Sequence, residues 1–352
     1  MVSMAPRLCV AENSDRLAGV LTGVDALEAL CRRYAFGDVH ALLPLLGLPS
    51  TALKRVRRLC LFGQRLLELD AEDFDMSDVE SGGPEYEALV DRARQCRIPQ
   101  NPGETNRGAL ASMRPAYGLL LEVLAARHRR HEMAGLVATA HMIAEYLPIL
   151  PWEQVWGHAA DPMRIGRNAA GRGSHFGRQD SQCKHRRSDR NAAARVLRIH
   201  QAPPEGWRTY LDRQHSNVAH AIGICAAACR TPCSIVTRVD AHARQQLTER
   251  ARIAMAFEES ALVRLRHSAP VGHGFGVPSE DEVARTWDHV RTVIGNRGGI
   301  GKAVLEEDGY CLPGLPSLIS AIAGCPITPS TLLQETAELT VVRLHEALEG
   351  GR

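Results

Sequence analysis

The sequence predicts a mainly α, multi-helical protein, and three observations support that fold class. Of the 352 residues, 45% are hydrophobic but only 5% are aromatic, so Leu, Ala, Val and Ile must build the core. A composition of this kind favours helices over sheets. In several stretches the apolar residues recur every three or four positions, as they do on one face of a helix. Nowhere do apolar and polar residues alternate in the sustained way that is typical of strands.

The first hundred residues are expected to form four helices. Two short amphipathic helices are expected near Gly19–Tyr34 and Asp38–Leu46. A longer one is expected over Ser50–Leu69, because Ser and Thr at its beginning can cap the free backbone N–H groups. The fourth should span Pro84–Arg97, since proline suits the first turn of a helix.

Two long helices and a short one are expected next, up to about residue 160. The helical pattern runs from Arg107 to Leu147, and the polar cluster Arg127–His131 marks the place where two helices should meet. Trp152 and Trp156 lie four residues apart, which predicts a short helix that carries two large rings. The second long helix has an apolar face that we expect in the core, formed by Leu136, Val137, Ala140, Ile143, Ala144 and Leu147.

The second half of the chain is also predicted to be helical. Helices are expected over Ser188–His200 and Glu205–Cys229. Asp240 can cap a long helix over Ala241–His267. Ser279 and Glu282 match the Ser-x-x-Glu capping box, in which each side chain satisfies a backbone N–H of the other residue, before a helix to Ile294. A last helix is expected over Ser330–Leu348.

The most unusual stretch is Arg164–Arg198, which we call the basic segment. It holds ten Lys or Arg residues and two Asp residues, a net charge of +8, whereas the whole chain carries +2. The remaining residues therefore sum to −6, so the positive charge is confined to one stretch. Its first part is rich in glycine and is expected to be a loop. Such a charge asymmetry indicates contact with a polyanion.

Nucleic acid is the polyanion that we predict, bound through its phosphates. Lys and Arg that neutralise phosphates release counterions, which gives salt-dependent affinity without base recognition. Phe176 is the one aromatic ring of the segment besides His175, so base stacking is poorly provided for. Another acidic partner and a passive linker are the alternatives. The predicted contacts are Arg164, Arg167, Arg172, Arg178, Lys184, Arg186, Arg187 and Arg190.

Three cysteines at four-residue spacing form the best candidate for a metal site. Cys225 and Cys229 would share one helix face, and the turn at Pro232 could bring Cys233 toward them. Thiolates in this arrangement could hold zinc or, less readily, an iron–sulfur cluster. The alternative is that they are core residues, since free cysteine is among the most buried residue types. A fourth ligand would come from elsewhere, with Cys183 and His185 of the basic segment as the predicted candidates.

Signatures of enzymes are weak. Gly295–Lys302 superficially resembles a phosphate-binding loop, but Asn296 and Ala303 replace the required glycine and the serine or threonine. His141 and Glu145 lie four apart and could share a proton or a metal, and His273 lies in a glycine-rich loop that could reach a ligand. No nucleophile motif is present. Whether the chain is an enzyme is therefore left open.

These observations predict an N-terminal helical region over residues 1–160, a basic connector over 161–200 and a C-terminal helical region over 201–352. Two helical subdomains and one continuous helical array both fit this division. The function expected is nucleic-acid binding, with a structural zinc bracing the interface. A helical scaffold subunit that binds a protein partner, or an enzyme, is the alternative. The N-terminus lacks the apolar region of a secretory signal, no apolar run suits a membrane span, and ten scattered cysteines suit a reducing cytoplasm, bacterial in character.

Overall fold

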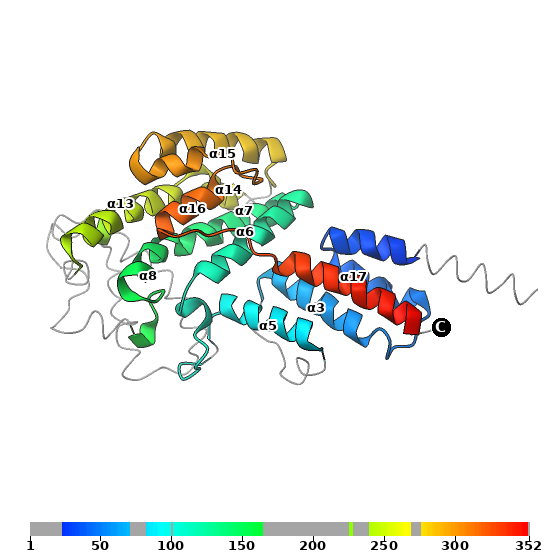
Figure 1. Ribbon diagram of the computed structural model, residues 1–352. Helices are drawn as coiled ribbons and strands as arrows, with labels where there is room; N and C mark the ends of the chain where they lie inside the picture. Colours follow the sequence, from blue (N-terminus) through cyan, green and yellow to red (C-terminus); the bar gives the residue numbers. More distant parts are fainter. Residues whose placement is uncertain are drawn as a thin grey trace, which may run out of the picture. The chain divides into compact units, whose positions relative to one another are not determined.

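The computed structural model describes residues 23–70, 82–99, 101–164, 225–227, 239–268 and 276–350. Regular structure in these ranges is entirely helical, which confirms the mainly α, multi-helical fold (Figure 1). The chain forms two compact units. Unit 1 comprises the helices up to Ala93 together with the C-terminal helix from Thr331 onward, and unit 2 runs from Arg94 to Ser330. The division at residues 160 and 200 stays a prediction, because most of that connector lies outside the described ranges.

Unit 1 is built from both ends of the chain. A helix over residues 23–32 is followed by α2 (Phe36–Leu42), η1 (Leu43–Leu46), α3 (Lys54–Glu68) and the first part of α5 (Pro84–Cys96). The last helix, α17 (Leu332–Gly350), lies alongside α3 (Figure 1). Gly63 lets α2 and α3 approach closely, because a Cβ there would lie 2.7 Å from the Phe36 ring.

Ion pairs join α17 to the N-terminal helices. The guanidinium of Arg92 contacts the Glu335 carboxylate at 2.6 Å, and Arg343 contacts Glu85 at 3.0 Å. These side chains are partly exposed, and exposed pairs of this kind contribute about 0–1 kcal/mol each. Burial of Leu333 and Leu344 therefore supplies more of the stabilisation than the ion pairs do.

Unit 2 is arranged around the apolar helix α7. Its elements are α6 (Arg114–Arg129), α7 (Met133–Tyr146), η3 (Leu147–Ile149), α8 (Leu150–Trp156), α13 (Ala241–Glu258), α14 (Ala261–Ser268), α15 (Glu280–Gly295), η5 (Gly299–Leu305) and α16 (Leu315–Ala323). Helix α7 contacts α6, α13 and α14. The predicted core face is confirmed, because all six of its residues are fully buried: Leu136, Val137, Ala140, Ile143 and Ala144 on α7 and Leu147 at the start of η3.

By length and composition alone, Met133–Trp156 could cross a membrane. This stretch covers α7, η3 and α8, and the mean hydropathy of its most apolar window is 1.4. A core helix of a globular protein meets the same criterion, and 61% of the window is buried inside the protein. Its packing therefore accounts for its hydropathy, and the stretch is weak evidence for a membrane.

Two of the predicted side-chain caps are confirmed, whereas the cap at Ser50 or Thr51 is wrong. Helix α3 begins at Lys54 without a side-chain cap, because the N–H groups of Ala52 and Leu53 bond to the Pro49 carbonyl and form a turn there. The side chain of Asp240 accepts a hydrogen bond from the backbone N–H of Ala243 at 3.0 Å, at the start of α13. The Ser279 hydroxyl accepts one from Glu282 at 3.2 Å, at the start of α15. The polar cluster around His131 separates α6 from α7, as expected. Each of the confirmed signals is local, so the sequence alone was sufficient to place them.

The single long helix expected over residues 241–267 is wrong. The chain turns at Glu259 and Ser260, where Ser260 N–H bonds to the Phe257 carbonyl and Arg264 N–H bonds to the Ser260 carbonyl. Phe257 and Leu262 are both fully buried. Because they are five residues apart, one straight helix would point them in different directions, and the turn lets both enter the core.

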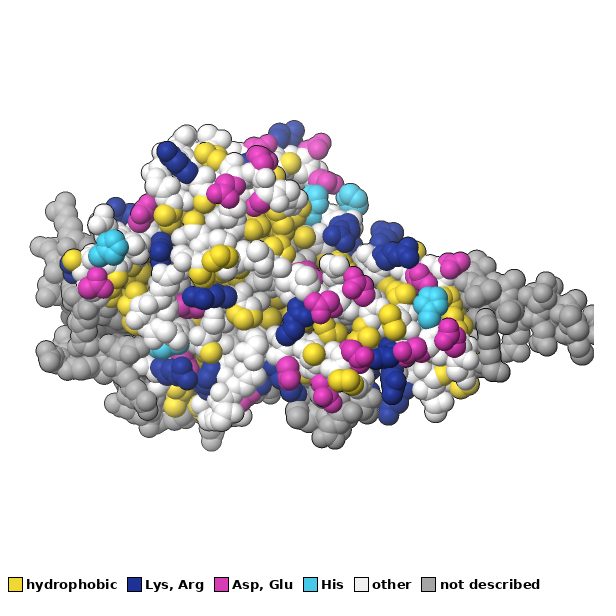
Figure 2. Space-filling model, viewed as in Figure 1, with side chains coloured by type: hydrophobic (Ala, Val, Ile, Leu, Met, Phe, Trp, Pro, Cys, Tyr) yellow, Lys and Arg dark blue, Asp and Glu magenta, His cyan; other side chains and the backbone are white. Residues whose placement is uncertain are grey.

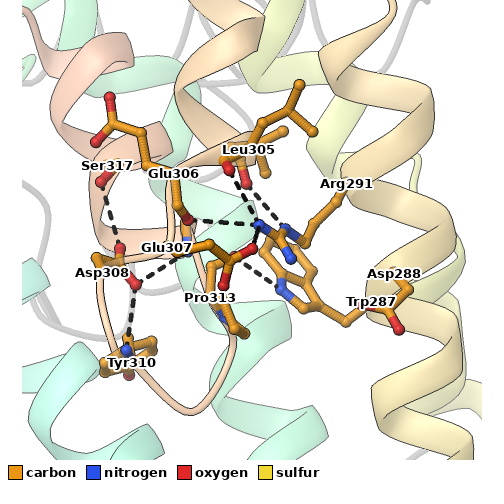
Figure 3. A network of polar contacts seen from close by, with 12 residues as sticks. Trp287, Asp288, Arg291, Leu305, Glu306, Glu307, Asp308, Tyr310, Pro313 and Ser317 are labelled. Atoms are coloured by element: carbon orange, nitrogen blue, oxygen red, sulfur yellow. Dashed lines mark hydrogen bonds and ion pairs between the residues drawn. The ribbon is translucent and has the colours of Figure 1, made fainter.

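Arg291 of α15 forms hydrogen bonds to the end of η5 and to the residues that follow it (Figure 3). Its Nε donates to the Val304 carbonyl at 3.0 Å, and its Nη2 donates to the Leu305 carbonyl at 3.2 Å and to the Glu307 carboxylate at 2.5 Å. Nearby, the Asp308 carboxylate accepts hydrogen bonds from the backbone N–H groups of Tyr310 and Gly314. One guanidinium therefore satisfies the carbonyl groups left at the end of a 3₁₀ helix.

Replacement of Arg291 by alanine should lower the free energy of unfolding by about 1–3 kcal/mol, because the carbonyl groups lose their charged donor. Urea denaturation followed by circular dichroism measures the change. Arg285→Ala is the matched control, since Arg285 is an exposed arginine of the same helix. Equal stabilities for the two variants would show that the Arg291 network contributes nothing.

Candidate nucleic-acid interface

The basic segment meets the described structure at its first residue, Arg164. This residue lies eight positions after Trp156, where α8 ends, and its side chain is about half exposed. The other predicted nucleic-acid contacts lie outside the described residues: Arg167, Arg172, Arg178, Lys184, Arg186, Arg187 and Arg190. Their role as contacts stays a prediction. The structure describes the place where the segment starts, which we call the anchor: Arg107, His158, Asp161 and Arg164.

Arg164 is held beside a buried carboxylate. Its Nε lies 3.8 Å from Oδ2 of Asp161, and its backbone N–H bonds to the Asp161 carbonyl at 2.9 Å. The Asp161 side chain is fully buried. Its Oδ1 accepts a further hydrogen bond from the backbone N–H of Met163 at 3.0 Å. The segment therefore starts from a residue whose backbone and side chain are both tied to the folded unit.

Arg107 compensates the charge of Asp161. Its Nε and Nη2 donate to the two carboxylate oxygens at 2.9 Å each, a bidentate pair buried within unit 2. The third nitrogen, Nη1, donates to the carbonyls of Pro102 and Glu104 at 2.9 and 3.2 Å. Buried charges are tolerated when they are paired and hydrogen-bonded in this way. The pair joins the loop before α6 to the chain that leaves α8.

His158 completes the anchor. Its Nδ1 accepts a hydrogen bond from the backbone N–H of Asp161 at 3.0 Å, and its ring stacks on Trp156 with the centroids 5.7 Å apart. The pKa of His158 is lowered from 6.5 to about 4, mainly by burial, while Asp161 opposes the shift and Arg164 adds to it. The imidazole is therefore neutral at physiological pH, with Nδ1 free of a proton so that it can act as an acceptor.

Sequence reasoning missed Arg107 and Asp161. The two residues are 54 positions apart, in loops that show no periodicity. Contacts between the loop before α6 and α8, such as the hydrogen bonds of Glu153 with Ser112 and Met113, bring them together. A single signal was available: an aspartate beside the predicted start of a strongly basic stretch.

The predicted metal site is described only at Cys225. This residue is fully buried in a single helical turn, residues 225–227, and Nε of Arg252 donates to the Ala227 carbonyl at 3.1 Å. Cys229, Cys233, Cys183 and His185 lie outside the described residues. Within the described ranges no group of three or more His, Cys, Asp or Glu side chains is arranged to hold a metal. The burial of Cys225 suits the core interpretation, and zinc stays a prediction.

The glycine-rich stretch Gly295–Lys302 closes α15 and begins η5. The backbone N–H of Ile300 donates to the Glu249 carboxylate at 2.9 Å. A phosphate-binding loop needs such N–H groups to face an anion, and here a glutamate already takes one of them. The stretch is therefore a helix connection, as expected. His273 of the other glycine-rich loop lies outside the described residues.

Comparisons with protein-family models, with curated proteins and with solved structures find no match for this chain. No relative therefore assigns a role to its residues.

The pKa of His158 predicts how stability depends on pH. The folded-state pKa of about 4 lies below the ordinary 6.5. Between these values the unfolded chain binds a proton that the folded chain excludes, so the free energy of unfolding should fall as the pH drops from 6.5 toward 4. His158→Asn keeps an acceptor near Nδ1 and should flatten this slope.

Urea midpoints measured across that pH range check the prediction. His289→Asn, at an exposed position of α15, is the matched control and should leave the slope unchanged. A slope that is the same for the wild-type chain and for His158→Asn would contradict the role of His158.

Proposed function

We propose that this protein binds nucleic acid by contacting the phosphate backbone through the basic segment, Arg164–Arg198. The observation that carries the proposal is the confinement of a +8 charge to this one stretch, while the rest of the chain sums to −6. On the face drawn in Figure 2, basic and acidic side chains of the described residues are interspersed. A concentrated positive charge on a mixed background is what binding to phosphates requires.

The anchor at Asp161 supports the proposal. One carboxylate cannot neutralise two guanidinium groups, so Arg107, Asp161 and Arg164 together carry a charge of +1. Arg107 takes both oxygens at hydrogen-bonding distance, whereas Arg164 Nε remains at 3.8 Å. That separation is beyond a normal hydrogen bond, so the half-exposed Arg164 keeps its donors for a phosphate. The anchor would hold the first cation of the segment in place and reduce the entropy lost on binding.

A structural zinc on Cys225, Cys229 and Cys233, with Cys183 or His185 as a further ligand, remains our proposal for how the basic segment is braced. Such a site would link the segment to the helix behind it. The metal content of the chain purified without added metal tests it: about one zinc per chain is expected, and a metal-free, folded chain would rule it out.

The alternative is a scaffold subunit whose basic segment binds an acidic protein. An acidic protein would be recognised by the same charges. The two functions therefore differ in how the binding constant depends on salt concentration and on the sequence of the ligand. Phosphate contacts give a linear dependence of log K on log salt, with a slope near −0.7 to −0.9 for each neutralised phosphate.

Filter binding of a duplex and of a single strand, each across a series of salt concentrations, tests the proposed function. The wild-type chain should bind both with a steep slope. The triple variant Arg186→Gln, Arg187→Gln and Arg190→Gln should lower the slope by about two, because up to three phosphate contacts are lost.

The matched control removes the same charge from α3, with Lys54→Gln, Arg55→Gln and Arg57→Gln. This variant should bind like the wild type. Affinity that does not respond to salt would contradict the proposal, and an equal loss in both triple variants would show that net charge, not the basic segment, governs binding.

A further inference from the structure

A cavity of about 430 Å³ lies between α8 and α13 of unit 2. This volume is within the range of about 300–1,000 Å³ that is usual for sites of small molecules. Buried Pro151, Val239 and Leu247 form its apolar part. Polar groups come from both helices: Gln154 from α8, Asp240 before α13, and Gln246 and Arg250 from α13.

The cavity adjoins the anchor of the basic segment. Trp156 lines the cavity, and the His158 ring stacks on it. His158 in turn accepts a hydrogen bond from Asp161, beside which Arg164 is held. Three successive contacts therefore connect the cavity wall to the first cation of the segment. A strand whose phosphate reached Arg164 would have its neighbouring nucleotides close to this cavity.

The polar groups of the cavity are held in position. Arg250 Nη1 donates to Oε1 of Gln154 at 2.6 Å, and Nε2 of Gln154 donates to the Gly324 carbonyl at 2.8 Å. The Arg250 guanidinium lies against Gly324, where a Cβ would be 2.4 Å from Nη1. Gln246 contacts the His242 ring through its Nε2, and this leaves its Oε1 as an acceptor. Both ends of the Gln154 amide are used within the protein, so the Arg250 guanidinium and the exposed Gln246 amide are the groups that can meet a ligand.

The charges of the cavity favour a neutral ligand. Among the described residues of its lining there is one cation, Arg250, and one carboxylate, Asp240. A phosphate would meet the arginine but also the repulsion of that carboxylate. A flat heterocycle with mixed donors and acceptors fits better, since bases are bound by amide and guanidinium groups at their edges and by apolar or aromatic contacts on their faces.

We propose that this cavity binds a base of the nucleic acid whose phosphates the basic segment contacts. The inference rests on the proposed function and deepens it. It also changes the expectation of backbone binding without base contacts, because amide, guanidinium and aromatic side chains of α8 and α13 line the cavity. Unpaired bases are the ones that can enter a pocket, so the preferred ligand is single-stranded.

Two single strands of equal length test the inference, one ordinary and one of abasic deoxyribose phosphates. The abasic strand keeps every phosphate and lacks every base. The full chain should bind the ordinary strand about tenfold more tightly than the abasic one, in keeping with the energy of one well-placed base contact. Gln246→Ala and Arg250→Gln should each remove most of this difference and leave the affinity for the abasic strand nearly unchanged.

Neighbouring residues of α13 provide matched controls. Gln245→Ala changes an exposed glutamine beside Gln246, and Arg244→Gln removes one charge from the same helix; neither residue lines the cavity. Both controls should keep the tenfold preference. Since Gln246 is exposed, its truncation should leave the fold intact even if Arg250→Gln does not.

The outcomes separate the two proposals. Equal, salt-dependent affinity of the wild-type chain for both strands would overturn the base pocket and leave backbone binding in place. A preference for the ordinary strand that survives in both cavity variants would overturn the assignment of the cavity. Failure of the chain to bind either strand would overturn the pocket together with the proposed function.

Discussion

The buried pair of Arg107 and Asp161 is the interaction on which the structure at the start of the basic segment depends. Removal of either partner would leave a charge without compensation in the interior, which typically costs about 3–5 kcal/mol. The pair also determines where the chain runs. It fixes the loop before α6 through the Pro102 and Glu104 carbonyls, and it fixes the exit from α8 through Met163.

Glu153 reinforces the same junction, because its carboxylate accepts hydrogen bonds from Ser112 and from the backbone of Met113 at the start of α6. Burial raises the pKa of Glu153, and these two donors oppose that shift.

This junction brings together features that are distant in the sequence. Trp156 and Val239, which line one cavity, flank the intervening stretch of the chain that contains the basic segment. The last described residue before that stretch is Arg164, held on the anchor, and Asp240 caps the helix that begins after it. Trp156, which is linked to Arg164 through His158 and Asp161, and Asp240 therefore line the same cavity. Under the proposed function, this arrangement would present phosphates to the segment and bases to the cavity at one place. Helix α7 contributes only as a support, since its buried face carries α13 and α14.

Local signals in the sequence were sufficient for the fold class and for several helix starts. The core face of α7 follows from its spacing, and the caps at Asp240 and Ser279 follow from side chains that can reach backbone N–H groups within three residues. Features that depend on contacts across the chain could not be predicted. The turn at Ser260 exists because Phe257 and Leu262 share a core, and α17 packs on α3 although nearly the whole chain separates them.

The candidate interface likewise has one feature that the sequence shows and others that depend on tertiary contacts. Its charge is visible in the composition, whereas the partners of Arg164 and the lining of the cavity are set by how α8 contacts α13 and the loop before α6.

The most direct test of the account is to map where a nucleic acid lies on the full chain. Ultraviolet crosslinking of a single-stranded oligonucleotide, followed by mass spectrometry of the crosslinked peptides, identifies the contacting residues without relying on any variant. The account predicts crosslinks within Arg164–Arg198 and at Trp156 or its neighbours on α8 and α13. Crosslinks confined to other surfaces, such as the basic residues of α3, or an absence of crosslinks under low-salt conditions, would contradict it.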